Sequence, residues 1–142
     1  MQMEENGMFE HRIVELTHAT EKDPNNTDKL YELGRALESA GRFEEALSKF
    51  ESIVLLEPED HESIHAVGAL NLVLGRNVAA ISSLTKATEL WEERPEYFVD
   101  LGDALYRSGN VQGAKAAYET ALPLALPNEE ICERIRTSLM KC

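Results

Sequence analysis

The sequence has few basic residues and no long hydrophobic run. Its 142 residues include 26 Asp and Glu but only 14 Lys and Arg, giving a net charge of −12. This acidic balance repels phosphate backbones and anionic lipid, so we expect no nucleic-acid binding. No apolar stretch approaches the roughly 18 residues that span a bilayer. The acidic start MQMEENGMFEH has no hydrophobic signal-peptide core, so we expect no membrane insertion.

Cysteine, histidine and phosphate-binding glycine loops are also scarce. Cys132 and Cys142 show neither metal-site nor disulfide-framework spacing, so a reduced, cytoplasmic setting is expected. The four histidines form no recognisable Ser-His-Asp or Cys-His set, and no G-x-G-x-x-G or G-K-[ST] motif occurs. We therefore expect a protein that is not an enzyme and uses no cofactor or metal.

The chain does contain an internal repeat of 34 residues. LGRALESAGRFEEAL begins at Leu33, VGALNLVLGRNVAAI at Val67 and LGDALYRSGNVQGAK at Leu101. In each segment a glycine inside an apolar helical pattern is followed seven residues later by another glycine and twelve residues later by an alanine. A fixed period of this length indicates a stack of similar supersecondary units.

The first copy shows what this spacing predicts. Gly34 lies on the buried stripe of the first helix, where the missing side chain lets a second helix approach closely. Gly41 ends that helix, since glycine enters the left-handed conformation without steric penalty. Ala46 and Phe50 lie on the face of the second helix that packs against the first. Pro58 ends the unit because it cannot continue a helix. Each unit is therefore predicted to be two antiparallel helices, packed small against large.

This pattern resembles the tetratricopeptide repeat family. The resemblance implies an all-α fold, a right-handed α-solenoid of three helical hairpins with a capping helix at each end. The full repeats are expected at residues 27–60, 61–94 and 95–126, within a single domain covering 1–142.

The flanking segments extend the pattern. Residues 7–24 align with a second helix and are expected to form an N-terminal capping half-repeat, although Arg12 stands where the small alanine should be. Residues 128–142 are expected to form a C-terminal capping helix, with Arg136 in place of the close-approach glycine. Pro123 is expected to kink the last second helix or to end it about one turn early.

The resemblance implies a concave groove, lined by the first helices, that receives a peptide or helix of a partner protein. The groove positions carried over onto this chain are Tyr31, Arg35, His65, Ala69, Leu72, Val73, Val99, Asp103, Tyr106 and Arg107. Leu72 and Val73 are consecutive apolar residues, which exceeds what one buried stripe requires. At least one is expected to face the groove or a neighbour, the alternative being that both pack inside the solenoid.

An acidic rim is expected beside the groove, at Asp28, Glu62 and Glu96. Each stands in the first turn of a helix, where the helix dipole alone favours a carboxylate. Some members of the family hold acidic C-terminal tails with a basic clamp, but of the matching positions here only Arg35 could serve. The predicted partner is therefore a peptide or amphipathic helix with basic flanks. The solenoid ends or the groove could also self-associate, giving a homo-oligomer.

Two other interpretations stay open beside a non-catalytic adaptor or scaffold. The size, acidity and three-repeat layout also resemble the translocator-class chaperones of type III secretion, small cytoplasmic proteins that hold hydrophobic segments. No motif unique to that class is matched. Residues 61–65, HESIH, match the H-E-x-x-H pattern of zinc hydrolases. No third ligand follows at a familiar distance, so we interpret this motif as a coincidence of helical spacing.

Overall fold

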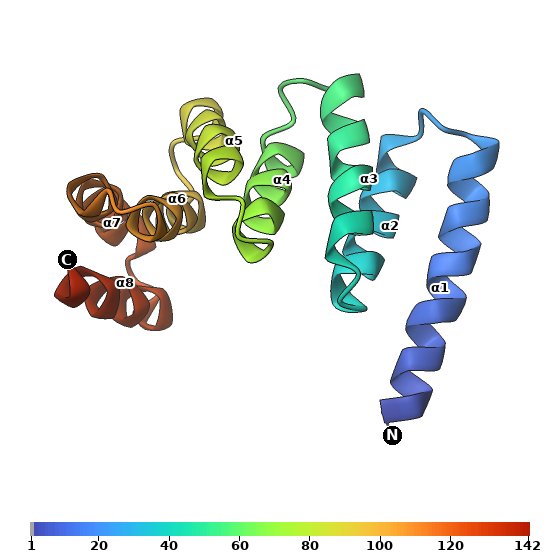
Figure 1. Cartoon of the computed structure of the whole chain (residues 1–142), viewed down its shortest axis with the longest axis horizontal. Coiled ribbons are helices and arrows are strands. Elements are labelled where there is room, and N and C mark those ends of the chain that lie inside the picture. The colour runs from blue at the N-terminus through green and yellow to red at the C-terminus, as the bar shows by residue number, and fades with distance from the viewer. Residues whose placement is uncertain (1) are drawn as a thin grey trace.

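The computed structural model describes residues 2–142, with side chains from residue 7 onward, and these residues form helices and no strand. The helices are α1 (Gln2–Lys22), α2 (Thr27–Ser39), α3 (Phe43–Leu56), α4 (His61–Val73), α5 (Asn77–Leu90), α6 (Pro95–Arg107), α7 (Val111–Ala125) and α8 (Glu129–Lys141). Each helix packs against the next along the chain, and the stack separates the two termini (Figure 1). The expected all-α solenoid is confirmed.

The three central hairpins, α2–α3, α4–α5 and α6–α7, are held together by the predicted close approach at glycine. A Cβ placed on Gly34 would lie 2.7 Å from Cζ of Phe50, and one on Gly102 would lie 2.6 Å from Cε1 of Tyr118. Gly68 is equally tight in the middle hairpin. Separations this short exclude any side chain at these positions unless the neighbouring residue moves. The repeated glycine therefore sets the distance between the two helices of each hairpin.

The second glycine of each repeat turns the chain between the helices. Gly41, Gly75 and Gly109 have φ angles of 76°, 77° and 92°, in the left-handed region. A residue with a side chain adopts this region only at a steric cost. The predicted helix-ending role of these glycines is confirmed.

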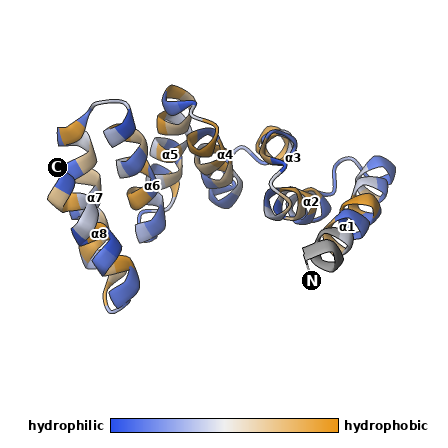
Figure 2. Cartoon of the chain, turned by 60° about the horizontal axis from the view of Figure 1, so that its bottom comes forward, coloured by the Kyte–Doolittle hydropathy of each residue, from blue (hydrophilic) through white to orange (hydrophobic). Residues whose placement is uncertain are grey.

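The buried apolar residues form clusters between neighbouring helices, and Figure 2 shows hydrophobic residues in orange along the helices. A large cluster joins α1 to α4 at one end and includes the fully buried Leu33 and Phe50. A second cluster joins α6, α7 and α8 and includes Tyr118 and Ile135. The core between these clusters is divided into two smaller groups, one of which includes Leu84.

The two ends of the solenoid carry arginine where an interior repeat carries a small residue. Arg12 of α1 is exposed, and its guanidinium donates to Glu32 of α2 at 2.9 Å. Arg136 of α8 is exposed and pairs with Glu133 at 3.1 Å. Along the buried side of α8, Cys132 and Ile135 are fully buried against α7.

Two boundaries differ from the expectations. Helix α1 begins at Gln2, five residues before the predicted capping segment. Of the two alternatives for Pro123, an early end of α7 is wrong, because α7 continues to Ala125, and a kink stays a prediction. A proline removes one backbone donor, and Pro123 lies in the last turn, where the helix has little further to run. Within residues 2–142, no helix combines the length and the apolar composition that crossing a membrane requires.

Candidate functional site

The predicted groove positions lie on the first helices α2, α4 and α6, and most of them are accessible. The exposed members are Arg35, Val73, Tyr106 and Arg107, and the half-buried members are Tyr31, His65, Ala69 and Asp103. Val73 is 59% exposed and Tyr106 is 39% exposed, so both offer apolar surface. These residues give the first-helix surface a mixture of aromatic, aliphatic and charged side chains.

Two predicted groove residues are buried, and their assignment to an open surface is wrong. Leu72 is only 7% exposed, because it packs towards the next hairpin beside Ala104 and the apolar side chains of α5. Val99 is 2% exposed, because α7 and the capping helix α8 cover it, with Ile135 in the same cluster. Of the consecutive apolar pair, Leu72 therefore faces a neighbouring hairpin and Val73 faces outward.

The first hairpin presents a tyrosine–arginine pair. The guanidinium of Arg35 donates to the hydroxyl of Tyr31, with Nη2–Oη at 3.0 Å, and lies 5.3 Å from the ring centroid. The same guanidinium pairs with Glu38 at 3.3 Å. A planar guanidinium held in this way keeps part of its surface for stacking or hydrogen bonding with another molecule.

The HESIH histidines lie at the joint between the second and third hairpins. His61 Nδ1 is 2.8 Å from the hydroxyl of Tyr97, and the His61 ring stacks on Trp91 at a centroid distance of 4.9 Å. His65 Nε2 is 2.6 Å from Asp100, and its ring stacks on Tyr97 at 4.4 Å. Burial raises the pKa of Tyr97 to about 12. Both imidazoles thus have partners on the next repeat.

The structure gives these histidines no metal-site geometry. Across the side chains described from residue 7 onward, no three His, Cys, Asp or Glu are grouped to hold a metal ion. The glutamate of the motif, Glu62, pairs with Arg94 at 3.0 Å. The five-residue motif therefore supplies contacts within the solenoid.

All three residues of the acidic rim are exposed, but they do not form one site. Asp28 and Glu62 line a common hollow of about 380 Å³ between the first and second hairpins, together with Glu32, Glu57 and Asp60. Glu96 does not line this hollow. The structure therefore concentrates the acidic surface near the beginning of α2 and α4.

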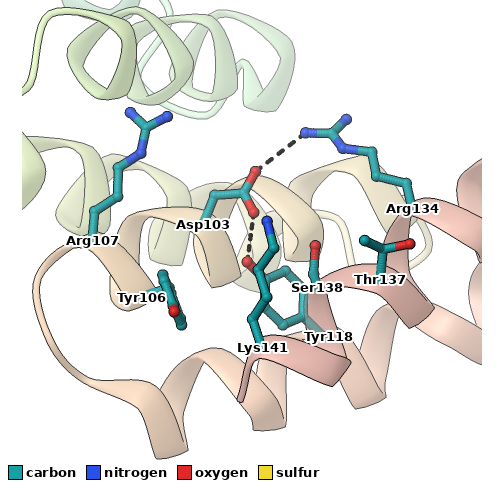
Figure 3. A pocket seen from close by; sticks show the side chains of 8 residues that line it. All are labelled: Asp103, Tyr106, Arg107, Tyr118, Arg134, Thr137, Ser138 and Lys141. Atoms are coloured by element: carbon teal, nitrogen blue, oxygen red, sulfur yellow. Dashed lines mark hydrogen bonds and ion pairs between the residues drawn. The ribbon is translucent and has the colours of Figure 1, made fainter.

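A second hollow lies at the other end of the first-helix surface, between α6 and α8 (Figure 3). Its volume is about 520 Å³, and it is lined by Asp103, Tyr106, Arg107, Tyr118, Arg134, Thr137, Ser138 and Lys141. The hydroxyl of Tyr118 donates to Oδ1 of Asp103 at 2.5 Å, and Arg134 donates to Oδ2 at 3.2 Å. Burial raises the pKa of Tyr118 above its ordinary value, and the bond to Asp103 raises it further. We call this place the α6–α8 hollow.

Most of this hollow was not predicted as a site. Asp103, Tyr106 and Arg107 were predicted as groove residues, but α8 was considered only as a cap. Its contribution is a polar stripe of Arg134, Thr137, Ser138 and Lys141, spaced at i, i+3, i+4 and i+7. That spacing puts the four side chains on one face of a helix, so the sequence held a signal for a second polar wall.

Two relatives of known sequence match a large part of this chain. DnaJ homolog subfamily C member 3 of Bos taurus is 27% identical over 116 residues, which are 82% of this chain and 23% of that protein. The Hsp70-Hsp90 organizing protein of Triticum aestivum is 34% identical over 96 residues, which are 68% of this chain and 16% of that protein. The chain thus spans less than a quarter of the length of either relative.

Solved structures share this architecture over most of the chain. MamA superposes with a TM-score of 0.81 at 21% identity, covering 99% of this chain and 90% of its own. The type III secretion chaperone SycD of Yersinia enterocolitica, solved in complex with a peptide of the translocator YopD, gives a TM-score of 0.77 at 20% identity. That superposition covers 80% of this chain and 89% of SycD.

The sequence profile of the tetratricopeptide repeat matches residues 15–61 and 70–128. These segments contain the glycine pairs of the first and third hairpins, whereas Gly68 of the middle hairpin lies between the two segments. They also run from the N-terminal half-repeat to the end of the third hairpin. The chain belongs to the tetratricopeptide repeat family.

Proposed function

We propose that this protein is a non-catalytic adaptor that binds a peptide or helix of a partner protein along α2, α4 and α6. The observation that supports this is the surface of the first helices, where Val73 and Tyr106 stay exposed beside Arg35 and Arg107. Tyrosine and arginine are among the residues that contribute most to protein interfaces. We further propose that the protein acts in the cytoplasm, without a cofactor and without nucleic acid.

The charge of the surface suggests the chemistry of the partner. The hollow that contains Asp28 and Glu62 is lined by five carboxylates and no Lys or Arg. Glu32 and Glu62 are paired with arginines, so a basic flank of the bound segment would pair with the other three carboxylates. Its apolar side chains would contact Val73 and Tyr106. Electrostatic complementarity of this kind fixes register and suppresses wrong partners.

Site-specific photo-crosslinking tests the groove directly. A benzoylphenylalanine replacing Tyr106 is expected to crosslink a partner in the native cell, and mass spectrometry of the adduct would identify it. The same residue replacing Val14 on α1 is the matched control, since Val14 is 64% exposed but lies on a second-helix type of element. An equal adduct at both positions would contradict the groove.

The identified partner then allows a quantitative test. Val73→Asp places a charge on the surface that would lie against the bound segment, and we expect affinity to fall by at least roughly tenfold, as for loss of an interface contact of average strength. Val14→Asp has a similar starting exposure and is expected to bind normally. Circular dichroism of both variants separates lost binding from lost folding.

A second candidate is a chaperone that keeps a hydrophobic secreted protein soluble. What favours it is the likeness to SycD, a chaperone of the same architecture that is solved with a peptide of a translocator. The two proposals differ in the state of the partner. An adaptor's partner is soluble by itself, whereas a chaperone's client precipitates when expressed alone and becomes soluble on co-expression with this protein.

A further inference from the structure

The α6–α8 hollow has the opposite charge to the rest of the molecule. It contains three cationic side chains, Arg107, Arg134 and Lys141, and one carboxylate, Asp103, although the chain carries a net charge of −12. Figure 3 shows these side chains arranged around one space, with Arg107 from α6 and the other two cations from α8. A cluster of positive charge on an acidic protein suggests that an anionic group binds in this hollow.

The carboxylate inside the hollow is already satisfied. Asp103 accepts from Tyr118 and from Arg134, so it compensates the charge of Arg134. Arg107 donates to the neutral main-chain carbonyl of Leu72 at 3.1 Å. Among the side chains described from residue 7 onward, no ion pair includes Arg107 or Lys141. Both cations line the hollow, and within the described side chains neither has a carboxylate at ion-pair distance.

Neutral donors accompany these charges. Thr137 and Ser138 line the same wall as Lys141, so their hydroxyls border the space between the cations. A carboxylate is recognised by charge-assisted hydrogen bonds from arginine and lysine, supplemented by hydroxyl groups. The planar guanidinium of Arg107 matches the two oxygens of a carboxylate in particular.

We propose that the α6–α8 hollow binds a carboxylate of the partner segment, either an acidic side chain or the C-terminal carboxylate of the chain. This inference rests on the proposed function, because the carboxylate belongs to the peptide that occupies the groove. The site lies outside the basic clamp known from some family members, of whose matching positions only Arg35 could serve here. It uses the end of α6 and the outer stripe of the capping helix.

Nuclear magnetic resonance titration of the labelled full chain with short probe peptides tests the site. The probes are Ac-Gly-Leu-Glu-NH2, Ac-Gly-Leu-Gly-OH, the neutral Ac-Gly-Leu-Gln-NH2 and the phosphorylated Ac-Gly-Leu-pSer-NH2, at constant ionic strength. At least one carboxylate peptide is expected to shift the signals of residues 106–107 and 134–141 and to bind roughly tenfold more tightly than the neutral peptide. The better of the first two probes tells which source of carboxylate the hollow prefers.

Two variants connect the binding to the cations. Lys141→Gln removes a charge that holds no partner in the structure and is expected to weaken the carboxylate probe by roughly fivefold to tenfold. Lys86→Gln, an exposed lysine on α5, is the matched control and is expected to change nothing. Arg107→Gln should weaken binding of the probe further. Because this change also removes the bond to Leu72, circular dichroism checks that the variant keeps its helix content.

The outcomes separate this inference from the proposed function. If carboxylate and neutral peptides bind alike, if their shifts spread over the surface, or if only the phosphopeptide binds, the carboxylate site is wrong. Crosslinking at residue 106 could still identify a partner, and then the adaptor proposal stands without this site. Carboxylate binding that depends on Lys141, together with no crosslinked partner, would show that the hollow binds carboxylates. It would overturn the adaptor proposal and, with it, the assignment of the carboxylate to a groove-bound partner.

Discussion

The first and third hairpins share one architecture but carry side chains of different chemistry at equivalent positions. The space above the close-approach glycine is filled by Phe50 in the first hairpin and by Tyr118 in the third. On the adjoining first helix, Arg35 corresponds to Asp103 at the same place in the repeat. The tyrosine hydroxyl reaches Asp103 at 2.5 Å, whereas the phenylalanine has no polar atom to offer.

This difference shows how a repeat acquires a site without changing its fold. Both rings meet the requirement of the hairpin, which is a large apolar face against a glycine. The added hydroxyl of Tyr118 then fixes the Asp103 carboxylate, which in turn holds Arg134 of the capping helix at 3.2 Å. The third hairpin is thereby joined to α8 by a polar hollow in addition to an apolar cluster, while the first hairpin is closed by an apolar cluster.

The largest expected effect comes from emptying the two equivalent positions. Phe50→Ala leaves a cavity in a fully buried cluster and is expected to destabilise the protein by about 3–5 kcal/mol. Tyr118→Ala is expected to cost less, because its space adjoins a hollow that water can enter. Urea unfolding followed by circular dichroism measures both. Equal losses, or a larger loss at Tyr118, would contradict the contrast between a closed and an open hairpin.

The sequence predicted the shared part of these hairpins well. The glycine pairs at a 34-residue period each have one steric purpose, so the helix pairs and their turns followed from spacing alone. What differs between repeats depends on contacts across them. Val99 is buried because α8 covers it, and His65 is held by Asp100, 35 residues further on.

Such contacts have no local signature. A five-residue motif such as HESIH shows only what one helix presents, and its partners Trp91, Tyr97 and Asp100 belong to the next repeat or the connection to it. The outer stripe of α8 was visible in the sequence, but its role required knowing that it lies beside the end of α6. The 34-residue period predicts which positions are equivalent. Contacts with the adjacent repeat determine whether each position is buried in the core, links two hairpins or lines a binding site.

Alkaline pH is expected to sharpen the contrast between the hairpins, with a smaller effect. The pKa of buried Tyr97 is raised to about 12, against about 10 in an unfolded chain. Between pH 10 and 12 the unfolded state therefore binds fewer protons than the folded state, so stability falls as pH rises, by up to about 2 kcal/mol. Below pH 10 this contribution is fully present. Tyr118, whose pKa is also raised, acts in the same direction, while Phe50 has nothing to ionise.

Melting temperatures recorded from pH 9 to 12 measure this effect. Tyr97→Phe and Tyr118→Phe are each expected to flatten the decline, whatever their stability at pH 9. The control is Tyr106→Phe, whose ring is 39% exposed. If all three variants decline as steeply as the unaltered protein, tyrosine ionisation does not control the alkaline stability of the third hairpin.

The smallest expected effect comes from giving the first hairpin the chemistry of the third. Phe50→Tyr alone buries a hydroxyl opposite Arg35, a donor that offers no acceptor, and is expected to destabilise the protein by about 1–2 kcal/mol. Arg35→Asp supplies the carboxylate that Asp103 supplies to Tyr118, so the double variant is expected to recover about 1 kcal/mol relative to the sum of the single changes. Urea unfolding of the four proteins gives this coupling energy.

The reference is the natural pair, examined with Tyr118→Phe and Asp103→Asn, which should show coupling of the same sign. Purely additive costs in the first hairpin would mean that the bond between Tyr118 and Asp103 depends on Arg134 and the capping helix, and that the two ends of the solenoid are not interchangeable.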